Sequence, residues 1–435
     1  MKILIIDEGG MGLGFALECQ AAGHSVKLFV SPRSKAARTG EGLVPRAYVW
    51  EPHMKWADLI FLADNSYATE ELDWYFKKGF PIFGCNQEGA TWELNRMAGQ
   101  RIFDLAGIKT IAGKSFTSFI DAEAYVKATP IRYVSKPNGD ADRKLSYVAK
   151  SAADMVYMLR CWAKSGKIKD EFILQDFMPG VEMSVGGWFG ADGWSKALCE
   201  NWEFKKLCSG EIGPTTGEMG TVLRYTENSK LADEVLFPVT SFLHAIGYIG
   251  YCDVNCIIDK AGVPYPLEFT MRPGWPIANI QRQLHRGDPA EWMLDKLEGR
   301  DTLQVNAEVA VGVVVAIGDF PHSHYTAKEV EGIPIYGLTK ANSKAISLSS
   351  AMSGHGPVMV GGKLTEQDII VSAGDYLCVC SATGSAVSET RDKALKVVKS
   401  LEIPDSPIYR TDIGDRLETQ LPILQALGYA KGVRF

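Results

Sequence analysis

The alternation of strand and helix patterns at the start of the chain is the feature that most restricts its possible folds. Short apolar runs cover residues 2–6, 26–30, 59–63 and 81–83, and a helical spacing of apolar residues connects the first two. Strand, helix and strand in repeated order are typical of a small, doubly wound parallel sheet. We therefore predict an α/β domain over residues 1–100.

A different pattern follows this domain. Longer strand-like runs cover residues 131–136, 172–176, 183–189 and 198–204, and hairpin-like turns separate them with few long helices between. Such a pattern is typical of a mostly antiparallel sheet with helices packed beside it. It predicts an α+β domain over residues 101–304.

The last part of the chain returns to short, apolar strands. Runs at residues 307–316, 345–348 and 376–381 precede a helical pattern over about 388–401. We predict a small, β-rich C-terminal domain over residues 305–435. The whole chain is therefore expected to be an α/β and α+β multidomain protein.

Composition excludes several classes of protein. Hydrophobic residues make up 46% of the 435 residues and charged residues 23%, which is an ordinary globular balance. The net charge of −6 does not favour nucleic acid as a partner. No run reaches the roughly 18–20 apolar residues that span a bilayer, so no membrane partner is expected. The nine cysteines lack C-x-x-C spacing, and we interpret them as reduced thiols of a cytoplasmic protein.

A glycine cluster, Gly10-Met11-Gly12-Leu13-Gly14, follows the first strand. Its spacing does not match the dinucleotide-binding fingerprint, and the second strand does not end in the acidic residue that such a site needs. A dehydrogenase is therefore a weak alternative. The cluster favours a helix N-terminus whose free N–H groups, including that of Gly10, face an anionic ligand. The open alternative is a tight strand–helix turn without a ligand.

Several polar residues at strand ends fit a nucleoside triphosphate site. Lys136 follows an apolar strand, and Arg143 and Lys144 add two cations shortly afterwards. Residues 175–182 end another strand and turn sharply, so their backbone is suited to a base and Glu182 to ribose hydroxyls. Fixed cations around phosphates are a general requirement of phosphoryl transfer.

Oxygen-bearing side chains also alternate along two later strands. Glu268 and Thr270 lie on one side of their strand, and Asp253 and Asn255 on one side of theirs. If the two strands pair, these four side chains converge, and hard oxygen ligands are those that Mg²⁺ prefers. Arg272 is then expected at the rim, beside the transferred phosphoryl group.

Three segments carry a resemblance to a known family. Residues 213–220 read GPTTGEMG, 267–274 read LEFTMRPG, and 409–416 read YRTDIGDR. They resemble, in the same order, the G-P-N-T-G-G-M-G, E-F-N-x-R-F-G and Y-R-x-D-I-G-x-R motifs of glycinamide ribonucleotide synthetase. Lys205 and Lys206 stand where that family has Lys-Arg. The similarity covers essentially the whole chain.

The resemblance implies an ATP-grasp fold, with ATP between two α+β lobes and the small lobe at about residues 118–185. It implies that glycine is activated by ATP to glycyl phosphate, which the amine of phosphoribosylamine then attacks. The cofactors would be ATP and Mg²⁺, with Mn²⁺ as an alternative metal. The partners would be small molecules, an amino acid and an amine, bound by a monomer or a homodimer.

The resulting candidate residues fall into four groups. Candidate ATP contacts are Lys136, Arg143, Gln175, Asp176, Phe177, Met178 and Glu182. Candidate metal ligands are Glu268, Asn255, Thr270 and Asp253. Candidate catalytic residues are Arg272, Lys144 and Lys206. Candidate substrate contacts are Gly10, Thr215, Thr216, Gly217, Glu218, Met219 and Gly274.

The chain also departs from the family pattern. The family's phosphate loop, K-A-D-G-L-A-A-G-K-G, is KPNGDADRKL over residues 136–145, and Thr270 replaces the usual Asn ligand. The G-G-R-E-H segment becomes residues 9–13, without its Arg, Glu and His. Two alternatives therefore stay open: the same ligase chemistry on a different amino acid and amine, or a degenerate ATP-binding regulatory protein.

Overall fold

A computed structural model of the chain describes residues 1–137, 146–164, 171–318, 320–322, 327–404 and 406–435. The first domain contains the parallel sheet that the sequence predicts. Its strands are β1 (Lys2–Asp7), β2 (Ser25–Val30), β3 (Leu59–Leu62) and β4 (Ile82–Phe83), in the order β2-β1-β3-β4. Because all four run in parallel, the carboxyl ends of β1 and β3 lie together at one edge.

Helices α1 (Leu13–Ala21) and α2 (Thr69–Lys77) connect strands of this sheet. Side chains alternate along β1, so that Ile3 and Ile5 join one buried cluster while Leu4 and Ile6 join another. Both faces of the sheet are therefore covered, as expected for a doubly wound arrangement.

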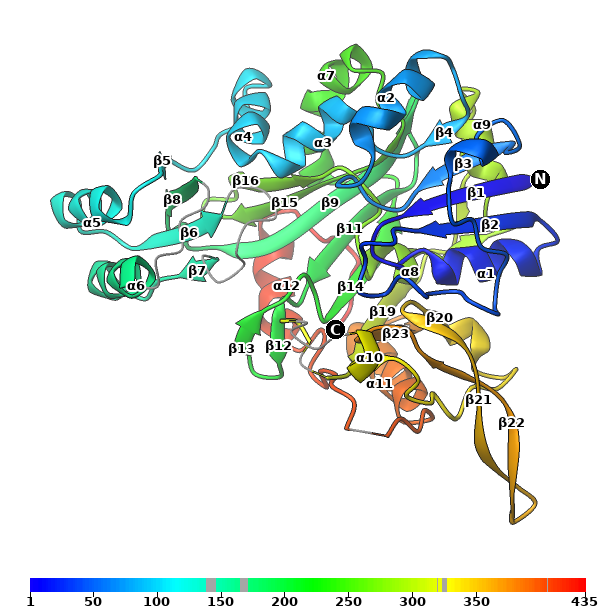
Figure 1. The fold of residues 1–435 in the computed structure, drawn as a ribbon. Coiled ribbons are helices and arrows are strands. Elements are labelled where there is room, and N and C mark those ends of the chain that lie inside the picture. Colours follow the sequence, from blue (N-terminus) through cyan, green and yellow to red (C-terminus); the bar gives the residue numbers. More distant parts are fainter. Residues whose placement is uncertain (138–145, 165–170, 319, 323–326, 405) are drawn as a thin grey trace.

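A large antiparallel sheet forms the centre of the molecule (Figure 1). Its main path runs β16-β15-β9-β11-β14-β19-β23-β20, and β10 pairs with β9. The strands are β9 (Val181–Gly190), β10 (Gly193–Trp194), β11 (Leu198–Glu203), β14 (Gly220–Thr226), β15 (Gly250–Ile258), β16 (Pro264–Thr270), β19 (Val309–Ala316), β20 (Ile346–Leu348) and β23 (Tyr376–Gly384). Strands β19, β20 and β23 follow residue 305 in the sequence and belong to the same sheet as the strands before it. The domain boundary at residue 305 stays a proposal.

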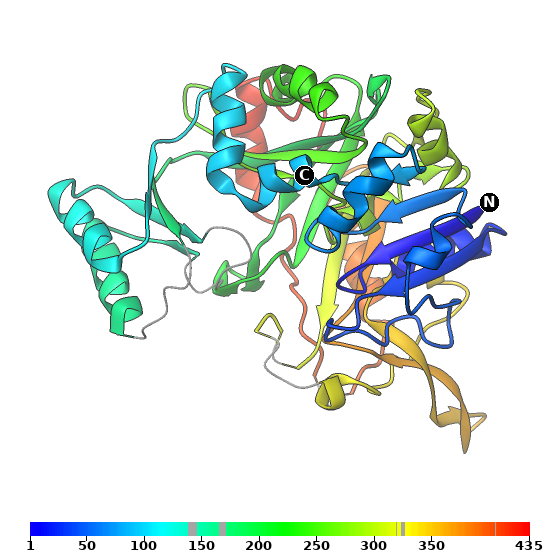
Figure 2. The ribbon, with the colours of Figure 1, turned by 45° about the horizontal axis from the view of Figure 1, so that its top comes forward.

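A smaller lobe projects from one side of the large sheet (Figures 1 and 2). It consists of a four-stranded antiparallel sheet in the order β5-β8-β6-β7 and two helices. The elements are β5 (Gly113–Phe116), β6 (Tyr133–Pro137), β7 (Tyr147–Val148), β8 (Phe172–Asp176), α5 (Phe119–Ala128) and α6 (Ala152–Lys164). The lobe has its own buried cluster, in which Phe119 contacts the rings of Trp162 and Phe172.

The remaining elements cover the sheets or extend from them. The helices are α3 (Gln87–Leu94), α4 (Arg96–Leu105), α7 (Thr240–Ala245), α8 (Ile277–Gln281), α9 (Glu291–Leu297), α10 (Ala327–Val330), α11 (Val387–Val398) and α12 (Leu417–Ala426). The strands are β12 (Lys206–Cys208), β13 (Ile212–Thr215), β17 (His285–Arg286), β18 (Gln304–Val305), β21 (Ala351–Val360) and β22 (Lys363–Ser372). Within the described part of the chain, no helix combines the length and apolar character needed to cross a membrane.

Candidate active site

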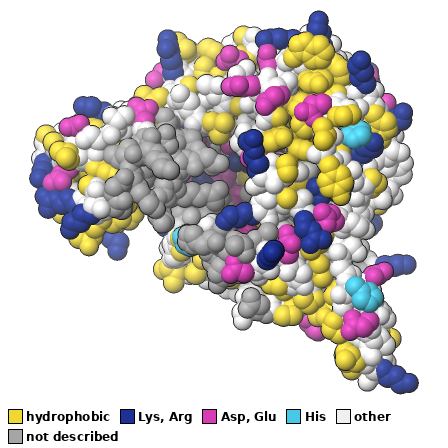
Figure 3. Space-filling view, in the orientation of Figure 1, with side chains coloured by type: hydrophobic (Ala, Val, Ile, Leu, Met, Phe, Trp, Pro, Cys, Tyr) yellow, Lys and Arg dark blue, Asp and Glu magenta, His cyan; other side chains and the backbone are white. Residues whose placement is uncertain are grey.

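A cleft of about 680 Å³ lies where the small lobe meets the large sheet. Figure 3 shows the hollow on this face of the molecule, with acidic side chains visible inside it. Elements from the small lobe, the large sheet and the segment after β13 all contribute to its wall. The volume lies within the range of sites that enclose cofactor-sized ligands.

One end of the cleft contains the predicted nucleotide contacts. Lys136 from β6 and Glu182 from β9 line it. The residues at the end of β8 also line it: Gln175, Asp176, Phe177 and Met178. Apolar side chains complete the wall there: Ile111, Val134, Val148, Ile257 and Leu267. An apolar slot beside a cation is suited to a base and its attached phosphates.

The ammonium group of Lys136 lies in a setting that disfavours its charge. Burial lowers the pKa of Lys136 to about 8, and the neighbouring cations Arg96 and Lys205 act in the same direction. The Glu268 carboxylate opposes them by favouring the charged form. An incoming polyphosphate would therefore complete the charge balance around Lys136.

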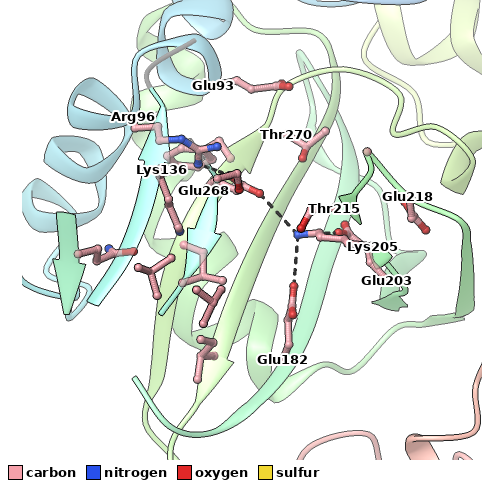
Figure 4. Close-up of a pocket in the computed structure, with 18 of the residues that line it drawn as sticks. Glu93, Arg96, Lys136, Glu182, Glu203, Lys205, Thr215, Glu218, Glu268 and Thr270 are labelled. Carbon is pink, nitrogen blue, oxygen red and sulfur yellow. Dashed lines mark hydrogen bonds and ion pairs between the residues drawn. The ribbon is translucent and has the colours of Figure 1, made fainter. Parts of the chain in front are cut away.

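Glu268 lies at the centre of the charged part of the cleft (Figure 4). It forms an ion pair with Arg96, and its Oε1 lies 3.6 Å from the Nζ of Lys205. Although burial alone would raise the pKa of Glu268, the cations Arg96, Lys205 and Lys136 hold it well below its usual value. Glu268 is therefore an ionised, partly buried carboxylate, as a metal ligand must be.

Lys205 connects the carboxylates of the cleft. Its Nζ lies 3.0 Å from an oxygen of Glu203, 3.2 Å from one of Glu182 and 3.6 Å from one of Glu268. Despite its burial, these three carboxylates raise the pKa of Lys205 well above its usual value. Sequence reasoning did not assign Lys205, Glu203 or Arg96 to the site. The only signal was the position of Lys205 beside Lys206, in a segment where the similar family also has two cations.

Lys206 lies at the base of the predicted substrate loop. Its Nζ donates a hydrogen bond to Thr215 Oγ1 at 3.0 Å and to the Gly213 carbonyl at 3.4 Å. In the same loop, Thr216 binds the Lys205 carbonyl through both its N–H, at 2.8 Å, and its hydroxyl, at 2.9 Å. These contacts fix the loop against the cationic pair.

The two strands pair, as the metal-site prediction requires, but only two of the four predicted metal ligands line the cleft. Asp253 lies opposite Thr270, and Asn255 lies opposite Glu268. Glu268 and Thr270 line the cleft, whereas Asp253 and Asn255 are absent from its described wall. No group of three or more His, Cys, Asp or Glu side chains suited to a metal occurs among the described residues.

The reason is a set of competing hydrogen bonds within the sheet. Asp253 accepts hydrogen bonds from Asn201 at 2.8 Å and from the Tyr251 hydroxyl at 3.2 Å. Gly186 lies opposite Asp253 on the neighbouring strand, and a Cβ there would come within 2.6 Å of the Asp253 carboxylate. The missing side chain lets Asp253 reach across β9 to Asn201. Asn255 likewise donates to Glu203, at 3.2 Å.

We predicted that N–H groups of the first glycine cluster face an external anion. This prediction is wrong for Gly10 and Gly12, because their N–H groups bind a side chain of the protein itself. The N–H groups of Gly9, Gly10 and Gly12 donate to the Asp7 carboxylate at 2.9, 2.8 and 2.7 Å. Asp7 is almost completely buried, so the chain supplies its own anion at this turn. Gly10 is also absent from the described wall of the cleft.

Most of the predicted substrate contacts lie in the cleft. Its wall includes Arg272, Thr215, Thr216, Gly217, Glu218 and Gly274. Met219 instead has no exposed surface and packs in a buried cluster, because successive side chains of an extended segment point to opposite sides. Arg143 and Lys144 lie outside the described residues.

Arg272 connects this part of the cleft to the parallel sheet. Its Nη2 lies 3.1 Å from Oε1 of Glu93, and Glu93 accepts a hydrogen bond from the side chain of Asn65, just after β3, at 2.8 Å. The indole N–H of Trp275, another residue of the cleft wall, donates to the Ala63 carbonyl at 2.9 Å. The cleft therefore extends towards the carboxyl edge of the first domain.

Comparisons with known proteins find similarity to phosphoribosylamine–glycine ligases along most of the chain. Residues 97–278 match the family described as phosphoribosylglycinamide synthetase, ATP-grasp (A) domain. A phosphoribosylamine–glycine ligase of Salmonella typhimurium is 23% identical, over 96% of this chain and 98% of that protein. One from Streptomyces coelicolor is 28% identical, over 77% of this chain and 78% of that protein.

A solved structure extends the likeness to three dimensions. The crystal structure of a phosphoribosylamine–glycine ligase from Thermotoga maritima has a TM-score of 0.70 and 20% identity to this chain. The similarity covers 95% of this chain and all of that one. The predicted ATP-grasp fold is thereby confirmed.

Proposed function

We propose that this chain, a divergent relative of the phosphoribosylamine–glycine ligases with an ATP-grasp fold, is an ATP-dependent ligase that joins a carboxylate to an amine. The observation that carries the proposal is one cleft that contains Lys136, Lys205, Glu268 and Arg272. These are the cations and the carboxylate that a phosphoryl transfer from ATP requires. The relatives named above are called ligases of this type, which agrees with the chemistry of the cleft.

In the proposed mechanism the adenine of ATP occupies the apolar slot, and Lys136 and Lys205 bind its phosphates. Arg272 holds the carboxylate substrate near the γ-phosphate. The carboxylate attacks the γ-phosphorus and forms an acyl phosphate, with ADP as the leaving group. The amine then attacks the acyl carbon and inorganic phosphate leaves. Cations that are already in place stabilise the negative charge that develops in both steps.

The residues present fit a magnesium ion. Glu268 is ionised and Thr270 lies beside it in the cleft wall. Mg²⁺ commonly takes only one or two carboxylates and obtains its other ligands from water and phosphate, so a larger cluster is not required. When bound, Mg²⁺ or Mn²⁺ would neutralise phosphate charge. We propose Glu268 as the principal protein ligand, with Thr270 nearby.

Glycine and phosphoribosylamine are the default substrates, because the matched relatives bear the name of that reaction. One observation favours a different amine. The glycine turn of the first domain is filled by Asp7, and Glu8 and Asp64 add two more acidic residues at the same edge. Burial, together with the Asp7 charge, raises the pKa of Asp64 to about 7. An acidic edge suits a cationic amine better than a phosphorylated one.

The test is ADP release by the purified protein with ATP, Mg²⁺ and glycine, with and without freshly generated phosphoribosylamine. Release that needs both substrates, with glycinamide ribonucleotide detected by mass spectrometry, would establish the default reaction. Release restored only by another acid and amine would support the second candidate. ATP binding without turnover on any pair would refute the ligase proposal and favour a regulatory binder.

A further inference from the structure

One acidic side chain in the cleft has no role in the mechanism above. Glu218 lines the cleft, yet only 5% of its surface is exposed. Its Oε1 atom is buried and accepts no hydrogen bond from any residue that the structure describes. The similar family has glycine at this position of its G-P-N-T-G-G-M-G loop, so this carboxylate is a feature of the present chain.

The backbone holds the Glu218 side chain in place. The N–H of the next residue, Met219, donates to the Phe204 carbonyl at 2.8 Å, and the N–H of Phe204 donates to the Gly220 carbonyl at 3.0 Å. On the other side, a Cβ built at Gly217 would meet no atom within 4 Å. Glu218 thus follows a residue with open space beside it and precedes one that is held by a backbone hydrogen bond.

The cations near Glu218 are already paired with other groups. Lys205 lies 3.0 Å from Glu203, and Arg272 lies 3.1 Å from Glu93. Burial raises the pKa of Glu218 well above its usual value, the Glu203 charge adds to this effect, and Lys205 only partly offsets it. Burial of a carboxylate is unfavourable when one of its oxygens lacks a hydrogen-bond partner, and a ligand with a complementary charge reduces this cost.

A second buried polar atom, close to Glu218 although outside the described wall of the cleft, also has no hydrogen-bond partner among the described residues. The hydroxyl of Tyr376, in β23, is buried and forms no hydrogen bond with a described residue. The charge of Glu218 contributes to raising the pKa of Tyr376, which places the two groups near each other. An ammonium group offers three hydrogen-bond donors, so one bound at Glu218 can satisfy the buried Oε1 and still donate to another acceptor.

The position of Glu218 indicates which substrate it faces. In Figure 4, Glu218 lies on one side of Lys205, whereas Lys136, Arg96 and Glu268 lie on the other. In this view Lys205 therefore separates Glu218 from the nucleotide contact Lys136. Arg272 lines the same cleft and interacts with Glu218.

We propose that Glu218 binds the ammonium group of an amino acid substrate while Arg272 holds its carboxylate, so that Glu218 selects amino acids over simple carboxylic acids. This inference rests on the proposed function, because it assigns the carboxylate substrate of that reaction to a chemical class. Glu218 is a specificity-determining residue. It distinguishes amino acids from simple carboxylic acids through the negative charge of its carboxylate and not through the shape of its side chain.

The experiment is isothermal titration of the protein loaded with ADP and Mg²⁺. The probes are glycine, L-alanine and β-alanine, with acetate and propionate as the matching acids without an amino group. We expect the wild type to bind at least one of the amino acids roughly tenfold to a hundredfold more tightly than the matching acid. Glu218→Gln should remove this preference, leave the affinity for the acids unchanged and leave the affinity for ADP unchanged.

A matched control replaces an exposed glutamate far from the cleft, Glu298→Gln, which should behave as the wild type. Unchanged amino acid affinity in Glu218→Gln, an equal loss for amino acids and acids, or a wild type that binds none of the amino acids would overturn the inference. The assay also separates the two proposals. Binding that depends on Glu218 in a protein that makes no amide product would keep this inference and refute the ligase.

Discussion

The pKa of Lys136 leads to a quantitative prediction about nucleotide binding. Burial lowers this pKa to about 8, so at pH 7 about nine in ten molecules carry the charged ammonium group and at pH 9 about one in ten. If only the charged form binds phosphate well, the apparent affinity falls with the charged fraction. The dissociation constant for ADP should therefore rise roughly tenfold between pH 7 and pH 9, which is about 1.4 kcal/mol of binding free energy.

The sign follows from linkage. A phosphate beside Lys136 favours its charged form, so binding takes up a proton above the pKa of the free protein and weakens as the pH rises. The assay is titration of the intrinsic tryptophan fluorescence with ADP at half-unit steps from pH 7 to 9.5 at constant ionic strength. Ten tryptophans are present, and Trp275 lines the cleft.

Lys136→Arg is the matched variant, because arginine keeps its charge over this whole pH range. Its affinity for ADP should change much less between pH 7 and pH 9 than that of the wild type. An equal decline in the variant, or a constant affinity in the wild type, would refute the assignment of Lys136 to the phosphates.

Three further predictions concern the metal and the core. Replacing Glu268 with Gln should lower magnesium-dependent turnover at least about 100-fold; a fully active variant would reject this residue as the metal ligand. Glu200→Gln should lower the free energy of unfolding in urea by about 3 kcal/mol, because it leaves Arg224, 2.7 Å away, without its buried counter-charge. A loss below about 1 kcal/mol would show that this ion pair contributes no more than an exposed one. Phe103→Ala should cost about 3–5 kcal/mol by thermal or urea unfolding, since the ring is buried and stacked on Phe269 at 4.0 Å; near-wild-type stability would show that α4 is not held through this contact.

Patterns along the chain were sufficient for the order and type of the main elements. Alternating strand and helix predicted the parallel sheet of β1 to β4, and later strand-like runs predicted antiparallel pairing. They also predicted that Asp253 and Asn255 share one side of their strand and that Glu268 and Thr270 share one side of theirs, and these two strands do pair. These features depend on periodicity and on short segments, both of which are visible in a sequence.

Residues whose role depends on distant partners were not predictable in the same way. Arg96 precedes the small lobe by sequence, yet it pairs with Glu268, 172 residues later. Lys205 becomes the centre of the cleft only because β9, β11 and β16 bring three carboxylates to it. Such convergence requires the arrangement of strands in the sheet, which local periodicity does not specify.

The sequence by itself determined which charged residues stand at strand ends, and most of these line the cleft, as Lys136 and Glu268 do. Only the tertiary structure decided which polar groups remain available to a ligand. Asp7 turns back onto the glycine N–H groups and Asp253 reaches Asn201, so both are used internally. Glu218 keeps a buried oxygen that no described residue hydrogen-bonds. Hydrogen bonding is a competition among all neighbours in space, and those neighbours exist only once the chain has folded.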